Sequence, residues 1–227
     1  TLHVIKEFAN SSNDNSMPTG INFSEAVEKY KNDNTMLGID VSSFQGEIDW
    51  EKVKNAGVEF AIIRLGFGYT VNMELVLDKY FQANLEGAKN QGLKVGVYFY
   101  TYANTLEEIE EQAKFINDNL HGEELELGVT FDWENWNNFQ DYQVSFYDLN
   151  NMYDNFSSIL KNKGYDTMLY GSKFYLSNVW STSNRKIWLA HYTSMTNYDE
   201  DYKIWQFSDK GLVDGINGFV DLDILYK

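Results

Sequence analysis

The 227-residue sequence predicts an α/β fold in which one irregular barrel of mostly parallel strands makes up a single domain. Strand patterns and helix patterns alternate at least five times, which is typical of a parallel sheet with helices outside it. So many units in a chain of this length favour one closed, TIM-like (β/α) barrel over a doubly wound sheet. No phosphate-binding loop supports a nucleotide fold, because Gly66-Phe-Gly68 lacks the third Gly and the following helix.

Each strand is predicted from a short apolar run, and each helix from apolar residues at a spacing of three and four. Strands are expected over 36–42, 60–65, 94–100, 127–131, 167–170, 186–192 and 202–207, with a last apolar run over 218–224. Helices are expected over 49–57, 79–90, 105–120 and 142–162, and a loop is expected to open with Gly66 to Tyr69. The later helices are weak, so we expect an irregular barrel.

Residues 1–35 are polar and rich in Asn and Ser, apart from a short amphipathic stretch over 23–30. We interpret them as a linker or an N-terminal appendage packed on the domain, and residues 36–227 as the catalytic barrel. The appendage is expected to contribute little to catalysis. The chain begins with Thr rather than Met, which indicates a processed or excised fragment whose targeting or anchor region has been removed.

The composition excludes several classes of function. A formal net charge of −16 argues against nucleic acid and against adhesion to anionic membranes. The absence of Cys excludes disulfides, thiolate metal sites and Cys nucleophiles. No apolar run is long enough to span a membrane. No His/Cys cluster indicates zinc, and a hard cation on carboxylates is the weaker interpretation, so we expect neither a metal nor a cofactor.

The most informative stretch is an apolar, β-prone run that ends in two acidic residues. Side chains alternate across a strand, so Asp132 and Glu134 point the same way, with Cα atoms roughly 6.5 Å apart. Cleavage of a glycosidic bond needs such a pair, one group to protonate the leaving oxygen and one to stabilise the oxocarbenium-like transition state. The simpler alternative is that Asp132 and Glu134 are two acidic residues at an exposed strand end, without a role in catalysis.

Further polar groups stand at the ends of other expected strands. They are Asp40, Tyr98 with Tyr100, and His191 with Tyr192. In β/α barrels the reactive groups lie at the C-terminal ends of the strands. This coincidence strengthens the prediction of a catalytic cleft there.

Several motifs, in order and at ordinary spacing, resemble those of the glycoside hydrolase family 25 lysozymes, which are muramidases of Gram-positive bacteria and their phages. The resemblance begins with Gly38-Ile-Asp-Val-Ser-Ser-Phe-Gln-Gly46 and extends from about Leu37 to the end of the chain. The other motifs are Ile48-Asp-Trp50, Phe60-Ala-Ile-Ile-Arg-Leu-Gly-Phe-Gly68, Gly96-Val-Tyr-Phe-Tyr-Thr-Tyr-Ala103, Phe131-Asp-Trp-Glu134, Ile187-Trp-Leu-Ala-His-Tyr192, Ile204-Trp-Gln-Phe-Ser208 and Val220-Asp-Leu-Asp223.

The resemblance implies an irregular β/α barrel that cleaves the β-1,4 bond between N-acetylmuramic acid and N-acetylglucosamine in peptidoglycan. Carried over by motif, Glu134 is the acid, and Asp132, Asp40 and Asp221 are the other carboxylates of the cleft. Asp223 is a neighbouring alternative to Asp221. The resemblance favours retention assisted by the substrate acetamido group, whereas the strand spacing alone leaves the stereochemistry open.

Burial beside Trp133 or Trp136, together with nearby carboxylates, would favour the proton that Glu134 needs as an acid. Asp40 and Asp221 could instead form ion pairs, for example with Arg64. The residues expected to bind substrate are Arg64, Tyr98, Tyr100, Tyr102, Trp136, Trp188, His191, Tyr192, Trp205 and Gln206. Strand alternation must bury about half of the aromatic residues among them. For His191, a structural role is an equal alternative to contact with the ligand.

Two alternative functions fit parts of the sequence less well than a lysozyme does. A family 18 chitinase-like hydrolase also ends a barrel strand in Asp-Trp-Glu, but it has Asp at positions that here hold Thr130 and Leu127. A catalytically silent glycan-binding module has no need of four carboxylates. We therefore expect an extracellular or cell-wall-associated enzyme, a monomer whose partner is the glycan strand of peptidoglycan.

Overall fold

The computed structural model describes residues 20–68 and 74–227, and it confirms the predicted barrel. Within these residues eight strands close into a ring through the pairing of β8 with β9. Seven of them are parallel, and β10 runs antiparallel between β9 and β2. The ring consists of β2 (Thr35–Val41), β3 (Phe60–Gly68), β5 (Lys94–Thr101), β6 (Val129–Trp133), β7 (Thr167–Ser172), β8 (Ile187–Ala190), β9 (Ile204–Leu212) and β10 (Val220–Tyr226).

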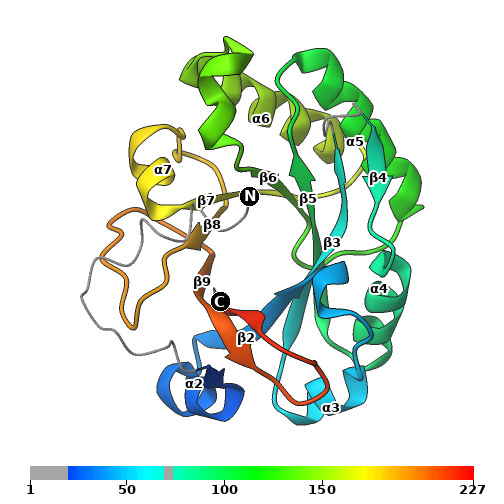
Figure 1. Cartoon of the computed structure of the whole chain (residues 1–227), viewed down its shortest axis with the longest axis vertical. Coiled ribbons are helices and arrows are strands. Elements are labelled where there is room, and N and C mark those ends of the chain that lie inside the picture. The colour runs from blue at the N-terminus through cyan, green and yellow to red at the C-terminus, as the bar shows by residue number, and fades with distance from the viewer. Residues whose placement is uncertain (1–19, 69–73) are drawn as a thin grey trace.

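Helices cover the outside of the ring unevenly. The longer ones are α4 (Phe81–Asn90), α5 (Leu106–Leu120) and α6 (Phe146–Lys161), which form one continuous flank (Figure 1). The short ones are α3 (Trp50–Asn55) and α7 (Lys173–Asn178), with 3₁₀ turns η1 (Ser43–Gln45) and η2 (Trp136–Tyr142). Between β8 and β9 the chain forms no helix, so the barrel is irregular, as predicted. No helix in the described ranges has the length and apolar character of a membrane span.

The helix predicted over 142–162 begins only at Phe146. Ser145 adopts an extended conformation before the first turn, and its hydroxyl oxygen accepts the backbone N–H of Asp148. The Asp148 carboxylate accepts the N–H of Ser145 in return, which completes a reciprocal cap. The residues just before this cap form η2, so the segment that follows Glu134 is a separate 3₁₀ turn.

Two apolar cores flank the sheet. The larger core lies between the sheet and the helices and contains residues such as Val97, Phe131 and Phe156. The smaller core fills the barrel, because it joins side chains from strands that are not neighbours, such as Phe60, Met168 and Leu225. Gly38 makes room for this interior, since a Cβ there would lie 2.5 Å from the Phe60 ring.

The loop expected to open at Gly66 is instead a continuation of strand β3, which runs to Gly68. The short strand β4 (Leu75–Leu77) pairs with this end of β3, and β5 pairs with it on the other side. Gly66 is needed because a Cβ there would lie 2.3 Å from the Val76 carbonyl oxygen. The pattern looked like a loop because Gly permits a close approach of backbone as readily as a turn. Tyr69 lies outside the described residues.

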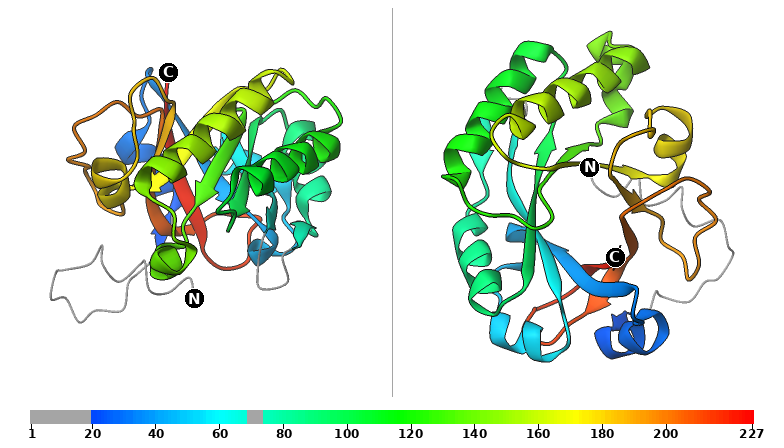
Figure 2. Two further views of the ribbon diagram at one scale, coloured as in Figure 1. Left: turned by 90° about the horizontal axis from the view of Figure 1, so that it is seen from above. Right: turned by 180° about the vertical axis from the view of Figure 1, so that it is seen from behind.

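The described part of the N-terminal segment packs on the barrel. It consists of β1 (Ile21–Asn22), which pairs with the end of β9, and the amphipathic helix α2 (Phe23–Tyr30), whose bounds match the predicted stretch. Phe23 is buried in the larger core, and the Tyr30 ring contacts that of Trp205 on β9. The blue helix α2 lies on the outside of the barrel (Figure 2). The expectation that residues 1–35 matter little for catalysis stays a prediction.

Candidate active site

The four predicted carboxylates meet at one mouth of the barrel. Asp40 lies near the end of β2, Asp132 lies near the end of β6, and Glu134 follows β6. Because β10 is antiparallel to the other strands, its first residues lie at the same edge, and Asp221 stands opposite Asp40. The charges of Asp40, Asp132 and Asp221 all act on the Tyr98 hydroxyl. The mouth therefore carries a compact group of carboxylates where barrel enzymes hold their reactive groups.

Asp132 and Glu134 form a carboxyl–carboxyl pair. Asp132 is only 5% exposed, its side chain is in hydrogen-bond contact with Glu134, and its buried Oδ1 has no N–H or hydroxyl donor. Burial raises the pKa of Asp132 well above its usual range, and the charges of Glu134 and Asp40 raise it further, against a smaller lowering by Arg64. Two carboxyl groups in contact do not both ionise readily, so the pair keeps one proton. It can thus supply one proton and one negative charge.

Gln206 connects Asp40 to two tyrosines. Its Nε2 donates to Asp40 Oδ2 at 2.7 Å, and its Oε1 accepts from the hydroxyls of Tyr170 and Tyr192, both at 2.9 Å. A carboxylate can only accept, so the amide nitrogen must face Asp40 and the amide oxygen must face both hydroxyls. Each tyrosine uses its one proton on Gln206. The hydroxyl oxygen of Tyr192, which is half-buried, can then accept a hydrogen bond from a ligand.

Arg64 is held at the edge of the carboxylate group by Asp78. Its Nε and Nη2 lie 2.8 Å and 2.7 Å from Asp78 Oδ2, and Nη2 also donates to Ser43 Oγ. Asp78 is buried and accepts the backbone N–H groups of Ser43 and Tyr80 as well. Sequence reasoning missed Asp78. Its place just before α4 is typical of a local turn, and the sequence gives no sign of a partner on β3.

Breaking this buried pair should destabilise the fold. We expect Asp78→Ala to lower the free energy of unfolding by about 3–5 kcal/mol, because it leaves the Arg64 charge without its partner in a buried setting. Asp118→Ala is the matched control, since the exposed pair of Lys114 with Asp118 should contribute little. Urea unfolding measures both variants. Equal, small losses would contradict a structural role for the buried pair.

Tyr98 and Tyr100 lie on the interior face of β5, and Tyr102 follows the strand. Burial raises the pKa of Tyr98 well above its usual range, with Asp40 as the next cause. Burial also raises the pKa of Tyr100, with the Glu134 charge as the next cause. The rings of Tyr100 and Tyr102 meet edge to face with centroids 5.1 Å apart. Tyr98 and Tyr100 therefore lie beside the carboxylates, and Tyr102 lies against Tyr100.

An aromatic wall stands next to Glu134. Trp136 in η2 stacks on Tyr175 of α7, with ring centroids 3.8 Å apart and planes 10° from parallel. Burial raises the pKa of Tyr175, and the Glu134 charge adds to this, which places the phenol near that carboxylate. Phe174 meets Tyr175 edge to face and is 65% exposed. Such rings suit the apolar face of a sugar. Trp136 was predicted, whereas Phe174 and Tyr175 were missed, and their only signal was an aromatic pair directly after a strand.

Three predicted substrate-binding residues have structural partners in the barrel. Trp205 is buried in the outer core and donates its Nε1–H to the backbone oxygen of His191. Trp188 lies in the barrel interior and donates to Asp223 Oδ1 at 2.8 Å. His191 is half-buried, its Nδ1 lies 2.8 Å from Thr196 Oγ1, and burial lowers its pKa. These contacts give the three side chains roles in packing and hydrogen bonding, and their contact with substrate stays a prediction.

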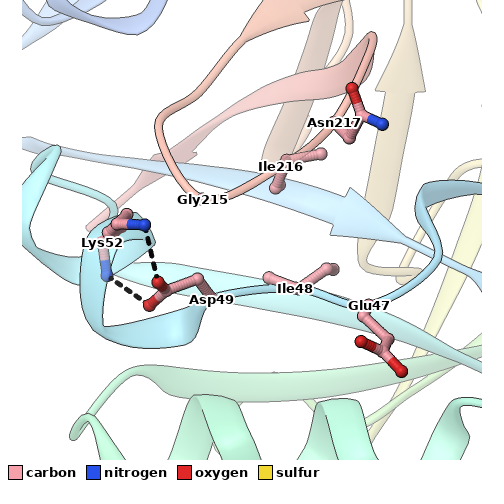
Figure 3. A pocket seen from close by; sticks show the side chains of 7 residues that line it. All are labelled: Glu47, Ile48, Asp49, Lys52, Gly215, Ile216 and Asn217. Atoms are coloured by element: carbon pink, nitrogen blue, oxygen red, sulfur yellow. Dashed lines mark hydrogen bonds and ion pairs between the residues drawn. The ribbon is translucent and has the colours of Figure 1, made fainter.

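A surface hollow of about 510 Å³ is lined by none of the four predicted carboxylates (Figure 3). It is formed where the β9–β10 connection meets the segment before α3, and the Asp49 N–H donates to the Gly215 carbonyl there. Its charged groups serve the fold, because Asp49 caps α3 and pairs with Lys52 at 3.0 Å. Across residues 20–68 and 74–227, no group of three or more His, Cys, Asp or Glu is arranged to hold a metal ion.

Comparison with known proteins gives concordant results. Residues 39–216 match the family Glycosyl hydrolases family 25. An autolytic lysozyme of Clostridium acetobutylicum is 36% identical over 191 residues, which cover 83% of this chain and 55% of the relative. The solved bacterial lysozyme from Streptomyces coelicolor has a TM-score of 0.71 at 25% identity, over 85% of this chain and 92% of that one.

The modular autolysin LytC from Streptococcus pneumoniae, solved in complex with a synthetic peptidoglycan ligand, has a TM-score of 0.74 at 24% identity. The alignment covers 86% of this chain and 48% of the autolysin. The present chain thus spans about half the length of the Clostridium relative and of the autolysin.

The family match extends from β2 into the β9–β10 connection and so includes most of the barrel. It contains Asp40, Asp132 and Glu134, while Asp221 lies just beyond it. The Clostridium relative supports the same assignment over most of the chain. By the family match, the chain belongs to family 25 of the glycosyl hydrolases.

Proposed function

We propose that this chain is a peptidoglycan hydrolase, a lysozyme of the 1,4-β-N-acetylmuramidase type, which cleaves the β-1,4 bond between N-acetylmuramic acid and N-acetylglucosamine. The observation that carries the proposal is the Asp132–Glu134 pair, which keeps one proton at the mouth of a family 25 barrel. The printed names of two relatives, an autolytic lysozyme and an autolysin with a peptidoglycan ligand, support the choice of substrate.

In this proposal the proton of the pair, which burial favours on Asp132, crosses the hydrogen bond to Glu134, and Glu134 passes it to the glycosidic oxygen as the bond breaks. Glu134 is half-buried at the mouth, whereas Asp132 is buried behind it, so Glu134 is the member that a bound glycan reaches. When the proton leaves, Glu134 becomes a carboxylate that can deprotonate the water for the second half of the reaction. The Trp136–Tyr175 wall would hold the sugar ring beside it.

Asp132 is assigned to the substrate acetamido group, which attacks the sugar C1 and leads to retention. A nucleophilic carboxylate lies about 5–5.5 Å from the acid, and an inverting base lies about 6.5–9.5 Å from it. Direct hydrogen-bond contact between Asp132 and Glu134 is closer than either distance and leaves no room for a sugar carbon between them. This contact supports a role in which Asp132 orients the acetamido N–H and stabilises the positive charge that develops.

The surrounding groups tune this pair and bind the glycan. Asp40 is one of the charges that raise the pKa of Asp132, so it helps the pair to keep its proton. Asp221, opposite Asp40, adds charge at the same mouth. The hydroxyl oxygen of Tyr192 accepts hydrogen bonds and suits a sugar hydroxyl.

Mass analysis of digested Gram-positive peptidoglycan tests the proposal. A muramidase must release fragments with N-acetylmuramic acid at the new reducing end, which borohydride reduction followed by mass spectrometry identifies. New reducing ends of N-acetylglucosamine would show that the other glycan bond is cut. Absence of new ends, with glycan still bound, would favour a silent binding module.

The glycan strand would be met outside the cell membrane, so we place the chain in the extracellular space or the wall. We predict that the isolated chain associates poorly with intact walls at low salt, because its net charge of −16 is repelled by anionic wall polymers. Sedimentation of the Glu134→Gln variant with walls should show binding that increases with salt, since screening shortens the electrostatic reach to about 8 Å at physiological ionic strength. Binding that weakens with salt would contradict this prediction.

A further inference from the structure

A second buried carboxyl group lies beneath the mouth, at Asp223 of β10. It has no exposed surface, and its Oδ1 accepts the indole N–H of Trp188 at 2.8 Å. Its Oδ2 is buried and has no N–H or hydroxyl donor. In the β10 ladders, Asp223 stands opposite Gly38 on one side and Gln206 on the other, directly below Asp40. A carboxylate oxygen left without a donor in this setting would be costly.

The contact with Asp40 explains how Asp223 can be buried with one oxygen that has no N–H or hydroxyl donor. The side chains of Asp223 and Asp40 are in hydrogen-bond contact, which two carboxylates can make only when one of them carries a proton. Burial raises the pKa of Asp223 well above its usual range and the Asp221 charge raises it further, against a smaller lowering by the hydrogen bonds with Trp188 and Asp40. Asp40 already accepts from Gln206 Nε2 at 2.7 Å, as an acceptor-only carboxylate does.

We propose that Asp223 is a positioning residue of the site: as a neutral carboxylic acid it donates a hydrogen bond to Asp40 and, together with Gln206, holds Asp40 as the charged acceptor beneath the cleft. The catalytic role of Asp40 rests on the proposed function, but the shared buried proton does not. The charge held on Asp40 in turn favours the proton of the Asp132–Glu134 pair. The barrel mouth would then contain two stacked carboxyl pairs, each with one proton.

The buried proton is tested by the pH dependence of stability. Folded protein keeps this proton, while the unfolded chain releases it above about pH 4, the ordinary range of Asp. The unfolding constant of the wild type should therefore rise with pH relative to that of Asp223→Asn, by about tenfold per pH unit, up to the pKa of the folded group. The amide of the variant can replace the O–H donor, so its fold is retained.

In the ratio of wild type to Asp223→Asn, the contributions of all other titrating groups cancel, because both proteins contain the same groups. The groups that face the Asp40–Asp223 pair or its immediate neighbours are Arg64 on β3, Tyr98 on β5, Asp132 and Glu134 at β6, Tyr170 on β7, Tyr192 after β8 and Asp221 on β10. Urea unfolding from pH 5 to pH 7 measures the ratio of the two unfolding constants. A ratio that stays constant over this range would overturn the proposal.

Activity tests the positioning role. Asp223→Asn should keep turnover on short glycan fragments within about threefold, since its amide still donates to Asp40. Asp223→Leu removes the donor and should lower turnover per folded molecule by about tenfold or more, as loss of one hydrogen bond to a charged group does. Leu225→Ala, on the same face of β10 in the interior core, is the control for disturbed packing and should leave turnover per folded molecule unchanged.

The two readouts separate this inference from the proposed function. If the stability ratio changes as expected but the wild type cleaves no peptidoglycan, the proposed function fails and the buried proton stands. If the wild type is a muramidase and Asp223→Leu keeps full turnover, or Asp223→Asn loses as much as Asp223→Leu, the positioning role is overturned.

Discussion

Replacing Glu134 with Gln is expected to lower turnover on peptidoglycan by about 10²–10⁴-fold, the range that general acid catalysis contributes. The amide keeps the shape of the side chain and can still form hydrogen bonds, so glycan binding should persist. It has no proton to give to the leaving oxygen. Asp132 cannot replace it, because it is buried behind Glu134 and loses in the variant the neighbour whose charge and hydrogen bond raise its pKa.

Steady-state rates and glycan binding, measured across pH, decide this prediction. In the wild type the rate should fall as pH rises through the higher apparent pKa of the Asp132–Glu134 pair, because the pair then loses its proton. That alkaline limb should be absent from Glu134→Gln. The control is Glu124→Gln, an exposed change at the opposite end of the barrel, which should behave as the wild type. Near-normal turnover by Glu134→Gln would show that the acid is another group.

The sequence could predict most of the barrel because its strands are short apolar runs separated by amphipathic helices. It could also predict the contact between Asp132 and Glu134, since alternation turns the side chain of Asp132 in β6 and that of Glu134 just after it to the same side. The same rule applies to Trp205 and Gln206, which are adjacent on β9 and so cannot both face the interior. Gln206 faces the carboxylates, and Trp205 packs outside.

What the sequence could not predict are contacts between distant segments. The partner of Arg64 is Asp78, which reaches it only because β4 folds back on β3. Tyr175 becomes part of the site because α7 packs its ring against Trp136, and no local pattern encodes that stack. Alternation along one strand is a local property, whereas the pairing of side chains across the barrel depends on its closure.

Asp132→Asn is expected to be the second severe change, with turnover lowered by about 10²–10³-fold, the loss seen when one preorganised electrostatic contact is removed from an active site. The amide preserves the volume of the buried side chain, which is 5% exposed. It removes the negative charge that is proposed to stabilise the acetamido group as it attacks C1. Turnover close to the wild type would contradict this role for Asp132.

A substrate with a better leaving group separates the two roles. An aryl N-acetyl glycoside with an acidic phenol needs little protonation, so Glu134→Gln should recover much of its rate in the cleavage step. Asp132→Asn should recover little, because attack by the acetamido group still needs the missing charge. Pre-steady-state release of the phenol measures this step without the later hydrolysis. Equal recovery of both variants would mean that Asp132 and Glu134 share the proton transfer, as a pair in direct hydrogen-bond contact could do.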